Sequence, residues 1–212
     1  MISADYPVCL RLKGRNILLV GGGEIATARA RELLAAGAQI RVVASRASAA
    51  LKELTSRREI TLEERPFEPA DVAGAHIVFT AINDLEVSHL VAAEARRLNI
   101  PINAADIPEL CDFTLPSVGR RGPITIAVST GGAAPALAAR LQRELTRSVG
   151  TRHIQLVRLV AWLRARIPGG PIRMKLLKEV VHGDVGNSLL DGQRARAFAN
   201  VRTQLQNLDA PQ

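Results

Sequence analysis

The fold is decided by the stretch Asn16-Ile-Leu-Leu-Val-Gly-Gly-Gly-Glu-Ile-Ala-Thr-Ala-Arg-Ala-Arg-Glu-Leu-Leu-Ala-Ala-Gly-Ala38. Its apolar run at residues 17–20 predicts a buried parallel strand, and the alanine-rich segment after the glycines predicts an amphipathic helix. Between them, Gly21-x-Gly23-x-x-Ala26 fits the dinucleotide-binding fingerprint. Gly21 permits a tight turn, and Gly23 lets the backbone approach a pyrophosphate. The N-terminus of the helix then supplies N–H donors for the phosphates.

The segments on either side continue an alternation of strands and helices. Helical patterns cover residues 47–58 and 84–98, and strand patterns cover 39–44, 60–63, 75–81 and 100–105. This alternation predicts a Rossmann-like, doubly wound parallel sheet. Residues 6–12 predict a short edge segment, and Gly37 is a plausible end for the first helix. His89 falls on the expected buried face of its helix and is interpreted as structural.

A different pattern begins after this alternation. Residues 111–117 and 123–129 resemble two strands around a turn at 119–122, and Pro135 suits the first turn of a helix that runs to about residue 149. From residue 151 onward every pattern is helical. Trp162, the single tryptophan, has the spacing of a core residue.

Composition narrows the class of protein. With 47% hydrophobic and 23% charged residues, and no apolar run of membrane-spanning length, the chain is predicted to be soluble and cytoplasmic, without a membrane partner. The first residues do not have the pattern of a signal peptide. Cys9 and Cys111 fit a reducing compartment and are expected to be buried as small apolar residues. The four histidines are scattered, so the sequence predicts no metal site.

Charge is unevenly distributed along the chain. Residues 1–139 carry 15 basic and 15 acidic residues, whereas residues 140–212 carry 13 basic and 5 acidic ones. This basic segment is either a solvated helical face or a surface that attracts a polyanion, such as nucleic acid or a polycarboxylate.

The end of the second predicted strand departs from the dinucleotide rule. An acid that binds the ribose hydroxyls is expected there, but the chain has Ser45 and Arg46. The pair fits a 2′-phosphate site and therefore NADP. Alternatively, Ser45 binds a ribose hydroxyl while Arg46 lies over the adenine. The motif leaves both interpretations open.

Several motifs taken together resemble one known family. They are Tyr6-Pro7, the glycine turn at 20–26, Asn103-Ala-Ala-Asp106, Phe113-Thr-Leu-Pro-Ser117 and Ala127-Val-Ser-Thr-Gly-Gly-Ala-Ala-Pro135. In this order they resemble the precorrin-2 dehydrogenase / sirohydrochlorin ferrochelatase family, the N-terminal part of siroheme synthase. The resemblance covers nearly the whole chain and is looser in the basic helical tail, where aromatic residues common in the family are replaced.

The resemblance implies an activity and an organisation. It implies oxidation of precorrin-2, an acidic tetrapyrrole, to sirohydrochlorin with NAD⁺ as cofactor; some members also insert Fe²⁺. It implies a homodimer with no nucleic-acid partner. The domains are then an NAD-binding Rossmann-like domain at 1–112, a dimerisation element at 113–149 and a basic helical domain at 150–212.

The resemblance also assigns roles to residues by position. Asp106 matches the catalytic aspartate, and Thr130 matches a hydroxyl position of the active site, here interpreted as substrate-binding. Contacts to the dinucleotide are implied for Glu24, Ile25, Ser45 and Arg46, in addition to Gly21 and Gly23 of the glycine fingerprint. The residues themselves are consistent with this. Asp106 follows the fifth strand at its carboxyl end, where such sheets bind ligands, and a carboxylate is a suitable base for dehydrogenation.

Each of these two residues also has a purely structural interpretation. Asp106 would form a turn before Pro108, with Asp112 and Glu109 as competing carboxylates, and Thr130 would cap a helix. Two other functions remain as alternatives: an NAD(H)-sensing module whose basic helices bind DNA, and a metal chelatase without redox activity.

Overall fold

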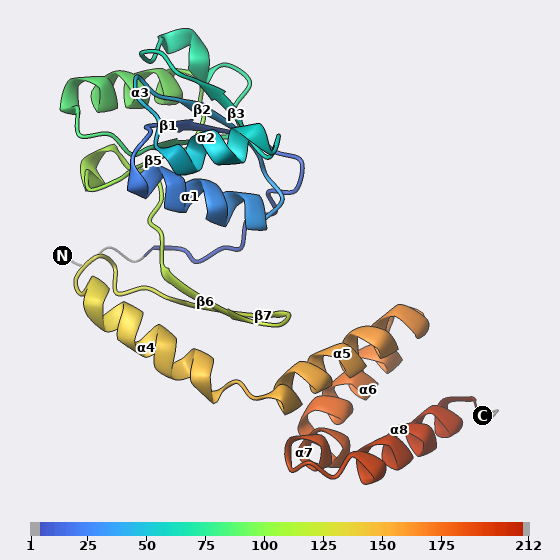
Figure 1. Ribbon diagram of the computed structural model, residues 1–212. Coiled ribbons are helices and arrows are strands. Elements are labelled where there is room, and N and C mark those ends of the chain that lie inside the picture. Colours follow the sequence, from blue (N-terminus) through green and yellow to red (C-terminus); the bar gives the residue numbers. More distant parts are fainter. Residues whose placement is uncertain (1–4, 210–212) are drawn as a thin grey trace. The chain divides into compact units, whose positions relative to one another are not determined.

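The computed structural model describes residues 5–209, and the side chains of all of these except residue 194 and residues 204–209. The chain divides into two compact units, Met1–Leu115 and Pro116–Gln212 (Figure 1). The predicted division at residues 149 and 150 stays a prediction.

The first unit is built on a five-stranded parallel sheet in the order β3-β2-β1-β4-β5. Its strands are β1 Asn16–Val20, β2 Gln39–Val43, β3 Thr61–Glu63, β4 Ile77–Thr80 and β5 Ile102–Ala104. They alternate with the helices α1 Glu24–Ala35, α2 Ala49–Ser56 and α3 Leu85–Arg97, and with the short 3₁₀ turns Pro69–Val72 and Pro108–Leu110. This order confirms the predicted Rossmann-like fold.

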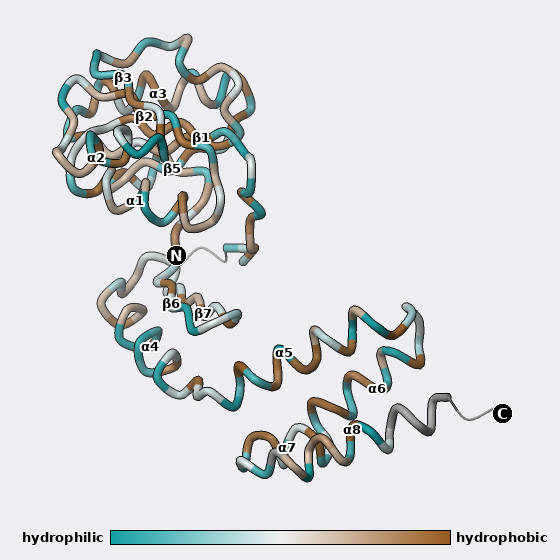
Figure 2. Tube along the Cα trace, turned by 45° about the vertical axis from the view of Figure 1, so that its right-hand side comes forward, coloured by the Kyte–Doolittle hydropathy of each residue, from teal (hydrophilic) through white to brown (hydrophobic). Residues whose placement is uncertain are grey.

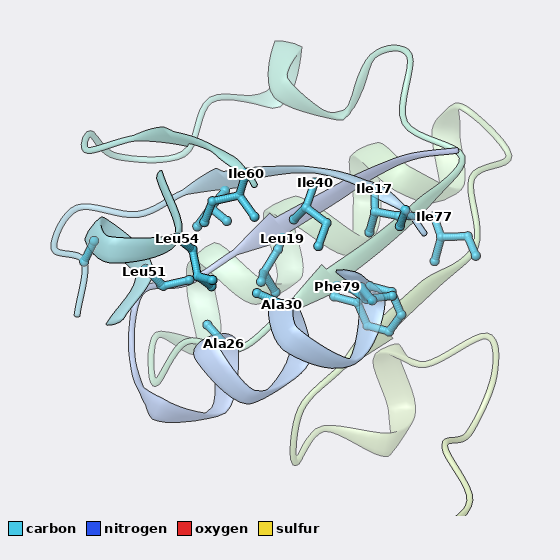
Figure 3. Packing of buried hydrophobic residues seen from close by; sticks show 14 residues of the cluster. Ile17, Leu19, Ala26, Ala30, Ile40, Leu51, Leu54, Ile60, Ile77 and Phe79 are labelled. Atoms are coloured by element: carbon cyan, nitrogen blue, oxygen red, sulfur yellow. The ribbon is translucent and has the colours of Figure 1, made fainter. Parts of the chain in front are cut away.

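The central strand β1 explains why the unit folds around the opening stretch. Ile17 and Leu19 face α1 and α2, while Leu18 and Val20 face the side covered by α3, and all four are at most 3% exposed. Figure 3 shows Ala26 and Ala30 of α1 close to Leu19, where their small side chains let the helix approach the sheet. The fully apolar run is therefore the signature of a strand that is covered on both faces.

Four details of the first unit differ from the sequence prediction. Residues 5–12 form no strand, and Cys9 is exposed rather than buried. Cys111 is half-buried, and its thiol contacts the backbone of Ala104. His89 is exposed, because the buried face of α3 is formed by Ser88, Val91, Ala92 and Ala95. The prediction that His89 is buried was therefore wrong, because the preceding residue, Ser88, occupies the buried face instead.

The second unit begins with an antiparallel hairpin, β6 Ser117–Arg121 and β7 Ile124–Val128, which packs on α4 Pro135–Ser148. The turn lies at Gly122 and Pro123, not at 119–122 as predicted. Gly122 has φ 58°, which suits the first position of a tight hairpin turn. Gly119 lies inside β6 because Gln142 and Thr146 of α4 occupy the space of a side chain there.

Four helices complete the second unit: α5 Thr151–Arg166, α6 Pro171–His182, α7 Asp184–Leu190 and α8 Arg194–Asp209. Hydrophobic and hydrophilic residues alternate along α5 and α6 (Figure 2). Their apolar sides form a small core with Leu156, Leu163 and Val180. Trp162 is 44% exposed and lies outside this core, contrary to the prediction, with Arg166 stacked on its ring. No helix within residues 5–209 is long and apolar enough to cross a membrane.

A buried carboxylate ties the edge of the sheet to the segment that follows β3. Asp71 is 5% exposed and forms ion pairs with Arg41 of β2 at 2.9 Å and with Arg65 at 2.6 Å. Its carboxylate also accepts the N–H of Glu68 at 2.9 Å. The hydrogen bonds from Arg65, followed by those from Glu68 and Arg41, hold the pKa of Asp71 well below its usual range.

We expect Asp71→Asn to lower the free energy of unfolding at pH 7 by roughly 2–3 kcal/mol, because Arg41 and Arg65 lose the buried one of the two carboxylates that they share, the other being Glu63. The folded pKa lies below the unfolded value of about 3.9, so this stabilisation is present above that pH and is lost as the pH falls. Urea unfolding at pH 7, 4 and 3 measures both effects. The exposed Glu59→Gln is the control, and equal losses in the two variants would contradict the prediction.

Candidate functional site

The glycine turn lies where the ends of three strands meet. The N–H of Gly21 donates to the carbonyl of Val43 at the end of β2, at 2.9 Å. Gly21 has φ 134°, and a Cβ there would collide with the carbonyl of Ala81, just after β4. Both the conformation and the space therefore require glycine at this position.

Gly22 is equally constrained, although the fingerprint leaves its position open. A Cβ on Gly22 would collide with the carbonyl oxygen of Arg46. The carbonyl of Gly22 accepts the N–H of Ser48 at 2.8 Å, and the Ser48 hydroxyl lies 2.9 Å from that of Thr27 on α1. The turn is thus fixed to the loop between β2 and α2. In the sequence, only the run of three glycines indicates that the backbone at Gly22 is closely approached.

Gly23 differs from its neighbours because nothing lies within 4 Å of where its Cβ would be. It is the N-cap of α1, and Glu24 and Ile25 occupy the first turn, where backbone N–H groups have no acceptor within the helix. Both side chains are exposed. An open backbone surface beside free N–H donors fits a dinucleotide pyrophosphate, so the residues present suit the cofactor.

The loop after β2 holds the two residues predicted to contact the ribose. Ser45 and Arg46 are both exposed. A carboxylate does lie beside this loop: Glu64 accepts the N–H of Ala47 at 3.1 Å and pairs with Lys52 at 2.9 Å. The hydrogen bond from Lys52, together with that from Ala47, lowers the pKa of Glu64. Glu64 follows β3 and was not identified from the sequence.

Asp106 lies in the turn after β5, at the carboxyl edge of the sheet. Its side chain is exposed, and its φ of 62° is in the left-handed region. Asp and Asn tolerate this conformation better than most residues. The N–H of the preceding Ala105 donates to Thr80 at the end of β4 at 2.9 Å, so the turn is held against the sheet.

The two competing carboxylates have different surroundings. Asp112 accepts the N–H of Ile102 at 3.0 Å and lies 3.7 Å from Arg96, so its carboxylate closes the loop after β5. Glu109 is exposed, and its backbone carbonyl accepts a hydrogen bond from Arg96 at 3.1 Å. Neither residue lines the pocket described next.

A pocket of about 320 Å³ opens beside Asp106 within the first unit. Its lining includes Ile25 of α1, Asn103 of β5, Asp106 and Leu115. The pocket therefore brings one predicted cofactor-binding residue and the predicted catalytic residue to the same place. The amide of Asn103 donates to the carbonyl of Phe113 at 2.9 Å, which holds the strand end in position.

Arg29 of α1 also lines this pocket and was not assigned a role from the sequence. In the sequence Arg29 is one of two arginines of this helix, the other being Arg31, and the pattern does not indicate which of them lies at the strand ends. Within the described residues, no group of three or more His, Cys, Asp or Glu side chains could hold a metal ion.

Thr130 belongs to the second unit. Its hydroxyl accepts the N–H of Ala134 at 3.1 Å, just before α4, and Gly131 and Gly132 follow it with positive φ. This hydrogen bond closes the turn before α4. The N-cap of α4 is Ala134 and has no side-chain cap hydrogen bond, so Thr130 does not cap the helix as expected from the sequence. The substrate-binding role of Thr130 stays a prediction, as do the roles of the other site residues.

The strand order, the glycine turn and the pocket at the carboxyl ends of the strands define a dinucleotide-binding protein of the Rossmann-like class. Residues 8–117 match the family described as "Putative NAD(P)-binding", and residues 121–148 match the one described as "Sirohaem biosynthesis protein central". The first match covers just over half of the chain. The chain therefore belongs to this NAD(P)-binding family of sirohaem biosynthesis proteins, as the resemblance predicted.

Curated relatives and a solved structure agree with this assignment. Siroheme synthase of Methylococcus capsulatus is 38% identical over 211 residues, covering 97% of this chain and 44% of the relative. The siroheme synthase of Methylobacillus flagellatus is 36% identical over 195 residues, covering 90% of this chain and 42% of that relative. The chain thus spans less than half the length of these relatives. The structure of "SirC, precorrin-2 dehydrogenase" has a TM-score of 0.73 and 27% identity, covering 97% of this chain and 99% of that one.

We expect substitutions at adjacent glycines to have opposite consequences. Gly22→Ala forces the turn away from Arg46, and overpacking of this kind costs roughly 2–3 kcal/mol, so Tm falls by about 10 °C. Gly23→Ala has room for its methyl group, so Tm changes by at most a few degrees, but the methyl blocks the approach of a pyrophosphate. Its affinity for NAD⁺ should fall at least about tenfold, a loss of about 1.4 kcal/mol.

Thermal unfolding and calorimetric titration with NAD⁺ measure these two effects on the same proteins. Equal losses of Tm in both variants would contradict the difference in packing, and unchanged NAD⁺ affinity in Gly23→Ala would show that the turn does not hold the pyrophosphate.

Proposed function

We propose that this protein oxidises precorrin-2 to sirohydrochlorin with NAD⁺. The observation that carries the proposal is the pocket that joins Asp106 to the first turn of α1 at the carboxyl edge of a dinucleotide-binding sheet. The likeness to siroheme synthases and to a precorrin-2 dehydrogenase supports this substrate class. The two free cysteines fit a cytoplasmic setting for the reaction.

The reaction removes a hydride and a proton from neighbouring positions of the macrocycle. NAD⁺, when bound at the glycine turn, would supply the hydride acceptor. Asp106 takes the proton on a carboxylate oxygen. The turn after β5 holds this residue at the pocket, and the backbone N–H groups at the start of α1 orient the pyrophosphate. Each turnover thus yields sirohydrochlorin, NADH and one proton.

We assign Ser45 and Arg46 to the adenosine end of NAD⁺. Both are exposed next to the turn, and the loop that carries them is tied to it through Gly22 and Ser48. The carboxylate of Glu64 interacts electrostatically with Arg46. Its negative charge would weaken the attraction between Arg46 and a 2′-phosphate. These surroundings support NAD⁺ over NADP⁺. Insertion of Fe²⁺ stays a prediction from the family resemblance.

We further propose that two copies of the chain associate through α4. Leu137, Leu141 and Leu145 recur every fourth residue along this helix and are 37–49% exposed. The neighbouring side, with Ala138, Gln142 and Thr146, is turned to the hairpin. Such an apolar stripe on a helix is typical of an interface. A second copy would cover it.

Asp106→Asn should lower kcat by about a hundredfold or more, because general base catalysis contributes about 10²- to 10⁴-fold. Asparagine tolerates the left-handed backbone, so Tm and NAD⁺ affinity should be unchanged. Turnover of precorrin-2 is followed by the absorbance of NADH and sirohydrochlorin. The exposed Glu109→Gln is the matched control.

If Asp106→Asn kept the wild-type kcat, Asp106 would not be the base. A wild-type protein that binds NAD⁺ but leaves precorrin-2 unchanged would refute the proposed reaction. The alternative, an NAD(H)-sensing module, would then be favoured by DNA binding that weakens steeply with salt.

Leu141→Glu should convert the dimer to a monomer, because burial of a carboxylate in an apolar interface is strongly unfavourable. Light scattering coupled to size-exclusion chromatography gives the mass of each species. Arg143→Glu places a carboxylate on the same helix at an exposed position outside the leucine stripe and should leave the dimer intact. A wild-type monomer at micromolar concentration would contradict the proposal.

A further inference from the structure

One cation lines the same pocket as the candidate catalytic carboxylate. Of the described residues that line it, Arg29 alone is positively charged and Asp106 alone is acidic. The remaining lining is apolar or amide, including Ile25, Phe79 and Leu115. At about 320 Å³ the pocket is at the lower end of small-molecule sites, so it takes one edge of a tetrapyrrole rather than the whole macrocycle.

The guanidinium of Arg29 makes a cation–π contact with Phe79, which in turn packs against Phe113. Its central carbon lies 5.6 Å from the centroid of the Phe79 ring. The Phe79 ring meets that of Phe113 edge-on, with centroids 5.8 Å apart. A cation over a ring face is attracted to it and loses few of its N–H donors, because the ring accepts no conventional hydrogen bond. Arg29 is thus positioned with donors to spare.

The ion-pair partner of Arg29 is a surface residue. Its Nη1 atom pairs with Glu32 on the next turn of α1 at 2.5 Å. The side chain of Glu32 is 61% exposed, whereas that of Arg29 is 27% exposed. Exposed helical pairs of this kind contribute little to stability, so Glu32 can be exchanged for another carboxylate at small cost. Arg29 therefore has a removable partner on one side and the pocket on the other.

We propose that Arg29 binds a carboxylate side chain of the substrate, which replaces Glu32, and so places the reacting edge of the macrocycle against Asp106. This inference rests on the proposed function, which makes the substrate a polycarboxylate. Guanidinium groups bind carboxylates through paired N–H donors, which fixes orientation as well as affinity. Arg29 is a substrate-binding residue in this scheme, and Asp106 remains the base.

The test compares two arginines of the same helix. Arg29→Gln should raise KM for precorrin-2 roughly tenfold to a hundredfold and leave kcat within about threefold, because a contact made equally in ground and transition states affects KM alone. Arg31→Gln removes the same charge from an exposed position that does not line the pocket and should leave KM unchanged. KM for NAD⁺ should be unchanged in both variants.

Further variants separate binding from packing. Arg29→Lys keeps the charge but not the paired donors and should recover part of the lost affinity. Glu32→Gln frees Arg29 from its partner, so KM for precorrin-2 should stay the same or fall. Tm reports on packing over Phe79, and titration with sirohydrochlorin in the absence of NAD⁺ measures binding without turnover.

The outcomes distinguish this inference from the proposed function. An inert wild-type protein would refute the proposed reaction, whereas an active one with equal KM values in Arg29→Gln and Arg31→Gln would refute only the role of Arg29. A lower Tm with unchanged sirohydrochlorin affinity in Arg29→Gln would likewise overturn it, because Arg29 would then serve packing alone.

Discussion

Gly22 has no room for a side chain because the carbonyl oxygen of Arg46 lies where its Cβ would be. The carbonyl of Gly22 accepts the N–H of Ser48, which caps α2 and hydrogen-bonds to Thr27 of α1. The glycine turn and the loop after β2 therefore form one fixed body. The first is suited to phosphates and the second carries the residues that we propose for the adenosine, so the spacing between them is set before any ligand arrives.

The central fold could be predicted because its signals are local. A buried strand, a glycine turn and an amphipathic helix follow one another within residues 16–38, and each has its own signature in the sequence. The partners of Asp71 could not be predicted in this way. The sheet brings together three separate segments that carry Arg41, Arg65 and Asp71. The sequence contains many other arginines and carboxylates, and nothing in it distinguishes these pairs from the others.

Boundaries and faces were less predictable for a related reason. The turn of the hairpin was placed at 119–122 because two glycines and two arginines suggest a loop, yet Gly119 is required by the approach of α4 and only Gly122 by the turn. Trp162 and His89 were assigned to buried faces by spacing alone. Spacing fixes which residues share a face, but which face is covered depends on the neighbouring elements.

The site residues show that structural and functional interpretations need not exclude each other. Asp106 does form a turn, and the left-handed backbone that makes it a turn residue also holds its carboxylate at the pocket. Thr130 closes the turn that leads into α4, and its hydroxyl keeps a proton to donate after accepting the N–H of Ala134. Arg29 packs on Phe79, and that contact uses none of its N–H donors, one of which binds Glu32. In each case the local structural role fixes the position of the polar group.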